Sequence, residues 1–92
     1  MPYAVELARR LFREGVEAAE AGRWDEARLR FTRVLSIRSA PLVRFNLALA
    51  CRNAGHLIEA VEHYRQFALD PSSAADRPRM AAAAQAIQLL TR

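Results

Sequence analysis

The segment EAGRWDEARLRF, residues 20–31, decides the fold because a related segment, NAGHLIEAVEHY, follows at residues 53–64. The two segments share a glycine, a glutamate and an alanine at matching places, 33 residues apart. The aromatic residue that ends the first segment, Phe31, matches Tyr64 at the end of the second. Repeats of this length are typical of stacked supersecondary units, so the sequence predicts a repeat architecture.

The composition is that of one small domain, residues 1–92. Hydrophobic residues make up 52% of the chain and charged residues 26%, a balance typical of folded globular proteins. No apolar run approaches the roughly 20 residues that span a bilayer. The N-terminal segment MPYAVELARRLF carries an early glutamate and no uninterrupted apolar core, unlike a secretory signal. We therefore expect a cytoplasmic protein with no membrane partner.

The spacing of apolar residues predicts five helices and no β-strand. They are expected at about residues 3–21, 24–37, 42–55, 57–69 and 77–91, with Gly22, Gly55, Pro41 and Pro71 at the breaks and Asp76 as the last N-cap. The residues expected to face inward are, helix by helix, Leu7, Ala8, Leu11, Gly15 and Ala18; Trp24, Ala27, Phe31, Val34 and Leu35; Leu47, Ala48 and Cys51; Leu57, Ala60, Val61, Tyr64 and Phe67; and Met80, Ala83, Ala84, Ile87 and Leu90.

These positions resemble those of the tetratricopeptide repeat (TPR) family. The first unit carries Leu11, Gly15, Ala18, Gly22, Trp24, Ala27 and Phe31, and the second carries Leu47, Ala48, Cys51, Gly55, Leu57, Ala60 and Tyr64, followed by LDP at residues 69–71. The resemblance implies an all-α fold of antiparallel helical hairpins stacked as a short α-solenoid. It implies repeat one at residues 8–40, repeat two at 41–73, and a capping helix or half of a third repeat at 76–91.

The sequence departs from the family in its period, at two positions and in its number of repeats. The period is one residue shorter than the usual 34 or so. Arg44 stands where the family commonly has a large apolar residue, and Phe67 replaces a small one. Two repeats are also fewer than the roughly three usually needed for stability, so we expect the last helix to cover the second hairpin.

The resemblance implies a non-enzymatic protein–protein interaction or scaffolding module that binds a peptide or helix of a partner in a concave groove. The first helix of each hairpin would line that groove with Arg9, Phe12, Arg13, Val16 and Glu20, and with Phe45, Asn46, Leu49, Arg52 and Asn53, while the last helix would add Arg79. In this interpretation the aromatic and leucine side chains hold apolar groups, asparagine amides pair with peptide backbone, and arginines grip carboxylates. The net charge of +4 favours an acidic partner.

A plainer interpretation of the same residues stays open. Arg9 and Arg13 would be solvated and would pair weakly with Glu6 and Glu17 on their own helix. The phenylalanines of the two hairpins would pack against each other. Family members that clamp a chaperone C-terminus carry a lysine and an asparagine where this chain has Phe12 and Val16, so we do not expect that activity.

Two other classes of function were weighed. One is self-assembly into a homo-oligomer through a second apolar strip on the last helix, made of Ala82, Ala86 and Leu89. The other is binding of nucleic acid by the arginines of the second helical segment, Arg28, Arg30, Arg33 and Arg38. Nearby glutamates and the lack of interleaved aromatic residues make a nucleic-acid partner the less favoured alternative.

The sequence contains no pattern typical of a catalytic site, so we expect no enzymatic activity and no cofactor. His56, Glu59 and His63 share one side of a helix at a spacing that zinc can use, but an exposed polar surface is the preferred interpretation, and no metal is expected. Cys51, the single cysteine, is expected to be a small buried apolar residue rather than a nucleophile.

Overall fold

The computed structural model describes residues 2–92, and this part of the chain is helical with no strand. The helices are α1 (Pro2–Glu20), α2 (Trp24–Ile37), α3 (Pro41–Asn53), α4 (Leu57–Leu69) and α5 (Arg77–Leu90), with a short 3₁₀ helix, η1 (Pro71–Ser73), between the last two. The expected all-α fold of five α-helices is confirmed. Over the same residues, no helix combines the length and the apolarity that a membrane crossing requires.

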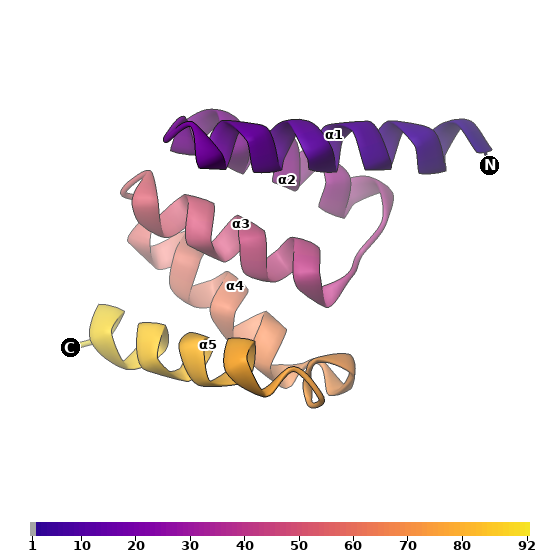
Figure 1. Ribbon diagram of the computed structural model, residues 1–92. Helices are drawn as coiled ribbons and strands as arrows, with labels where there is room; N and C mark the ends of the chain where they lie inside the picture. The colour runs from indigo at the N-terminus through magenta and orange to yellow at the C-terminus, as the bar shows by residue number, and fades with distance from the viewer. Residues whose placement is uncertain (1) are drawn as a thin grey trace.

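The helices stack in chain order, as Figure 1 shows. Helices α1 and α2 form one antiparallel hairpin, α3 and α4 form the next, and α5 lies on α4. The extensive contacts join successive elements only, so α1 and α5 form the two ends of the stack. This arrangement, in which each element packs on its neighbours in sequence, is that of a short α-solenoid.

The repeated glycine forms the same joint in both hairpins. Gly22 and Gly55 have positive φ angles of 78° and 90°, which glycine adopts without strain. One residue later, the backbone N–H of Arg23 donates to the carbonyl of Ala18, and that of His56 donates to Cys51, each at 2.8 Å. A residue in the left-handed region, followed by a backbone hydrogen bond to the carbonyl five residues earlier, is the Schellman motif. This motif ends a helix and reverses the direction of the chain.

Small residues at the helix crossings bring the backbones close together. Ala18, Ala27, Ala48 and Ala60 are all 0% exposed. Aromatic rings fill the remaining space, and Phe31, Tyr64 and Phe67 are among the largest fully buried side chains. The core is therefore a row of alanines that sets the helix spacing, flanked by aromatic rings that fill the layers between helices.

Most of the residues expected to face inward are buried or half-buried, but three positions on α4 and α5 were predicted wrongly. Leu57 is 47% exposed and Ala84 is exposed, whereas Ala86, which was assigned to an outer strip, is only 2% exposed. Leu57 lies in a groove with Leu90 and Thr91 at the C-terminal end of α5. Contact with this end of α5 leaves about half of the Leu57 side chain exposed. The two alanine errors have one cause: α5 carries alanine on several sides, and packing on α4 selects Ala83 and Ala86.

Arg44, a half-buried charged residue, pairs with a histidine on the next helix. It is half-buried on α3, and its Nη1 lies 3.1 Å from Nδ1 of His63 on α4. Because a guanidinium can only donate, Nδ1 must accept, which requires the neutral imidazole with its proton on Nε2. Burial, and then the charge of Arg44, hold the pKa of His63 below its ordinary value.

Candidate functional site

Apart from Arg79 on α5, the residues predicted to line a groove lie on α1 and α3. Figure 1 shows these two helices and α5 on the viewer's side of the stack, with α2 and α4 behind them. The pattern of exposure is mixed. Arg9, Arg13, Glu20 and Asn53 are exposed, while the other six are half-buried, namely Phe12, Val16, Phe45, Asn46, Leu49 and Arg52. We call this face, formed by α1 and α3, the α1/α3 surface.

The two phenylalanines of the α1/α3 surface pack within their own hairpins. The ring centroids of Phe12 and Phe31 are 5.6 Å apart. Phe45 lies 5.7 Å from Tyr64 and 5.2 Å from Phe67, both in edge-on arrangements. The aromatic ring pairs of residues 2–92 do not include one between Phe12 and Phe45. Each ring presents one part of its surface outward and supports the core with the other.

Helix α5 reaches the same surface through one arginine. The guanidinium carbon of Arg79 lies 5.7 Å from the centroid of the Phe45 ring, within the range of a cation–π contact. Asp76, the N-cap of α5, holds Arg79 by an ion pair of 2.9 Å. Arg79 thus covers part of Phe45 and extends the positive charge of the α1/α3 surface onto α5.

The polar groups of the surface differ in how far they are already used. Asn53 donates from Nδ2 to the carbonyl of Leu49, 3.0 Å away on the same helix. Arg9 lies 3.7 Å from Glu6, but both side chains are 74% exposed, and such pairs are weak in water. Among the ion pairs of residues 2–92, none joins Arg13 to Glu17. The expected pairing within α1 is therefore found for Arg9 but not for Arg13. The weak contact with Glu6 leaves the guanidinium of Arg9 accessible.

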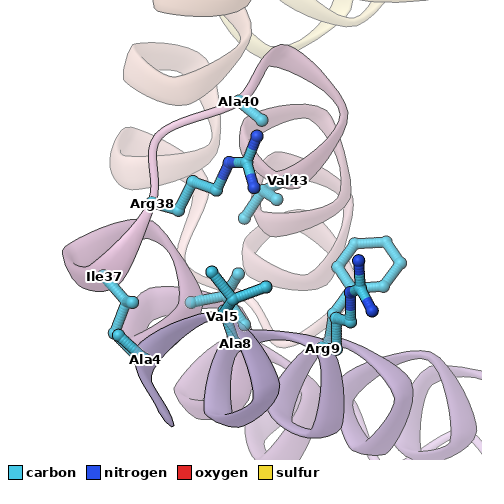
Figure 2. Close-up of a pocket in the computed structure, with 10 residues that line it drawn as sticks. Ala4, Val5, Ala8, Arg9, Ile37, Arg38, Ala40 and Val43 are labelled. Carbon is cyan, nitrogen blue, oxygen red and sulfur yellow. The ribbon is translucent and has the colours of Figure 1, made fainter. Parts of the chain in front are cut away.

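A cavity of about 400 Å³ opens at the N-terminal end of this surface, between α1, α2 and the start of α3 (Figure 2). Two of the predicted groove residues, Arg9 and Phe12, line it. Of the other lining residues, only Arg38 was predicted to have a binding role, toward nucleic acid. These residues are Ala4, Val5, Ala8, Val34, Ile37, Arg38, Ala40 and Val43. Among the described residues that line the cavity, the two arginines are the only charged ones, so this part of the chain forms an apolar space with positive flanks.

The cavity exists because α1 is longer than its counterpart in the second hairpin. With the 33-residue offset, Pro41 at the start of α3 matches Ala8, so the first turns of α1 have no equivalent. Those extra turns carry Ala4 and Val5, which form one wall. Their apolar side chains, placed one helical turn before Ala8 and Arg9, were the available signal in the sequence.

The arginines of α2 do not form a uniform basic face. Arg28 lies 3.2 Å from Asp25 and 3.9 Å from Glu59, and Arg30 lies 3.6 Å from both Glu14 and Glu26. A phosphate would have to compete with these carboxylates. The pair between Arg28 and Glu59 also joins the two hairpins, so Arg28 has a structural role.

The histidines and the cysteine take part in separate contacts. His56 lies 3.2 Å from Asp25, while His63 turns to Arg44. Within residues 2–92, no three side chains of the types that bind metal lie together as a potential site. Cys51 is buried, and burial, followed by the charge of Glu59, raises the pKa of its thiol to about 11. A thiol with that pKa stays protonated at neutral pH and is a poor nucleophile.

Comparisons with protein-family models, with curated proteins and with solved structures gave no match to this chain.

Proposed function

We propose that the protein is a non-enzymatic, TPR-like interaction module that binds a peptide or helix of acidic character on its α1/α3 surface. The observation that carries the proposal is the cavity at one end of that surface, because its described lining combines apolar side chains with arginine as the only charged type. Binding pockets are typically concave and apolar with a few convergent polar groups. The arginines of this surface are suited to carboxylates.

Two further observations support a ligand that lies along the stack. Val16 on α1 and Leu49 on α3 stand at matching repeat positions, and both are half-buried. Arg13 and Asn46 match in the same way beside them. An extended or helical peptide crossing both hairpins would therefore meet an apolar and a polar position on each.

The experiment is a selection of peptides from an unbiased displayed library, followed by affinity measurements on the selected peptides. We expect enrichment of sequences that combine Asp or Glu with large apolar residues. The test variant is Arg13→Glu combined with Leu49→Ala. Its matched control on α2 is Arg33→Glu combined with Leu29→Ala, which makes the same chemical changes at exposed residues.

The test variant is expected to bind the selected peptides about tenfold more weakly or worse, a loss of about 1.4 kcal/mol, while the control binds like the wild type. Circular dichroism checks that both variants remain helical. Equal binding by the wild type and the test variant, or an equal loss in the control, contradicts the assignment of the α1/α3 surface.

Self-association is the second candidate function, and one observation favours it. At the α4/α5 end of the stack, Leu57 and Ile58 are 47% and 88% exposed beside Val61 and Leu90. This patch replaces the predicted strip on α5, because Ala86 is buried. Sedimentation equilibrium should then give a mass that rises with concentration, and Ile58→Asp should return it to the monomer. A monomer mass for the wild type at every concentration excludes this function.

A further inference from the structure

We infer that the cavity between α1, α2 and α3 is the anchor point of the α1/α3 surface, and that it takes one bulky apolar side chain of a partner peptide flanked by carboxylates. This inference rests on the proposed function and specifies the ligand. The ligand is a peptide segment with one aromatic or large aliphatic residue and acidic neighbours. The size, the lining and the charge of the cavity each select part of this segment.

The size and lining define the apolar part of the ligand. A volume of about 400 Å³ lies in the range of sites that enclose organic groups, and it accommodates a phenylalanine or tryptophan side chain. Val5, Val34 and Val43 come from three different helices, and Ile37 closes the end next to Ala4 (Figure 2). Transfer of an aromatic side chain from water into this lining is favourable in proportion to the apolar area covered.

The two arginines define the charge of the ligand. Figure 2 shows Arg9 projecting from α1 and Arg38 from the segment after α2, with Val5 and Ala8 between them. None of the ion pairs within residues 2–92 involves Arg38, and Arg9 has only its long, exposed contact with Glu6. Within residues 2–92, the cavity lining contains no aspartate or glutamate. Carboxylates on either side of the anchor residue would find a guanidinium, whereas a basic peptide would be repelled.

The probes are three short peptides, blocked at both ends, with the sequences EEFEE, EEAEE and QQFQQ. Each is titrated to millimolar concentration into ¹⁵N-labelled protein, and amide shifts are followed by two-dimensional NMR. EEFEE is expected to shift the amides of cavity residues such as Val5 and Val43. Removing the ring in EEAEE, or the charges in QQFQQ, should each weaken the binding about tenfold.

Variants of the protein test the same two contributions. Ala4→Trp places an indole in the cavity and should abolish the EEFEE shifts, while Ala75→Trp, the same change at an exposed residue between α4 and α5, should not. Arg9→Glu combined with Arg38→Glu should remove the preference for EEFEE over QQFQQ. Its control, Arg33→Glu combined with Arg77→Glu, changes the net charge equally at exposed residues outside the cavity and should keep the preference.

The outcomes separate this inference from the proposed function. Equal affinity for EEFEE and EEAEE, or wild-type binding by Ala4→Trp, overturns the anchor. Shifts confined to Asn46 and Leu49 of α3 would also overturn it, although peptide binding by the surface would stand. Decanoate is titrated alongside as a small apolar carboxylate. Binding of decanoate without binding of EEFEE would identify a small-molecule site and would overturn the peptide anchor.

Discussion

Gly15 is the residue at which the first hairpin has the least room. A Cβ atom added there would lie 2.7 Å from Cε1 of the Phe31 ring, closer than carbon atoms approach in proteins. Phe12, which lies on α1 like Gly15, contacts the Phe31 ring of α2 and limits how far that ring can move away. In the second hairpin the matching residue is Ala48, which is 0% exposed, so the same crossing holds glycine in one hairpin and alanine in the other.

We therefore predict that Gly15→Ala destabilises the protein, although alanine favours helix by about 1 kcal/mol relative to glycine. The overpacking cost is about 1–3 kcal/mol and should outweigh that gain. Urea unfolding measures the difference. In a Phe31→Leu background the same substitution should cost less, because the smaller leucine side chain leaves room for the added Cβ. A Gly15→Ala protein more stable than the wild type would show that the ring moves freely.

His63 gives the stability a pH dependence whose sign follows from its contact. Its folded pKa lies below the ordinary 6.5 because burial and Arg44 disfavour the imidazolium. The unfolded chain therefore binds more protons as the pH falls through that value. The contribution of the neutral pair is fully present above pH 6.5 and is lost as the pH falls toward the folded pKa.

The prediction is a free energy of unfolding that decreases between pH 7.5 and pH 5.5, and that decreases less in His63→Gln. The glutamine keeps an acceptor for Arg44 but does not titrate. His56→Gln is the matched control, since His56 lies at the surface beside Asp25 and Glu59. Chemical unfolding at the two pH values measures the slopes. Identical slopes for the wild type and His63→Gln would refute the assignment of this dependence to His63.

At the scale of the element, α5 shows what the sequence pattern did and did not determine. The limits of α2 and α4 were predicted to the residue, and those of the other helices to within about two, because glycines, prolines and an aspartate N-cap mark most of the ends. The residues expected to face inward on α1 to α3 are all buried or half-buried, because large and small residues recur there at helical spacing. On α3 the prediction missed Val43 and Ala50, which are also buried. In α5 the run Ala81–Ala84 and Ala86 give several faces the same character, so only contact with α4 selects one.

A matched pair of substitutions on α5 tests that selection. Ala86 is 2% exposed and Ala82 is exposed, four residues away on the same helix. Ala86→Asp should cost about 3 kcal/mol or more, because a buried carboxylate would have no partner. Ala82→Asp carries the same change in helix propensity but should cost under about 1 kcal/mol. Thermal and urea unfolding compare the two, and equal costs would mean that α5 packs through another face.

At the scale of the whole molecule, the sequence predicted the stack but only part of the candidate site. The repeat placed Arg9 and Phe12 on the α1/α3 surface, and both line the cavity. The remaining walls come from the first turns of α1, some of which lie outside the repeat, from the end of α2 and the α2–α3 connection, and from the start of α3. A repeat pattern describes what the hairpins share, whereas this cavity arises where they differ, so it required the three-dimensional structure.

The linear stack also predicts how a local change spreads. Helices α2, α3 and α4 each pack on two neighbouring helices, whereas α1 packs mainly on α2 and α5 mainly on α4 and the adjoining η1. In such nearest-neighbour arrangements, regions open locally with free energies below that of global unfolding. Native-state hydrogen exchange should therefore show the strongest amide protection in α3, with weaker protection at both ends.

Two substitutions at opposite ends of the stack make the prediction specific. Gly15→Ala acts at the α1–α2 crossing and should reduce protection most in α1 and α2 and least in α5. Ala86→Asp acts at the α4–α5 contact and should give the reverse order. Exchange followed residue by residue by NMR, under native conditions, measures both profiles. If either substitution lowered protection evenly over the five helices, the chain would open only as one unit, and each end would be energetically coupled to the other through α3.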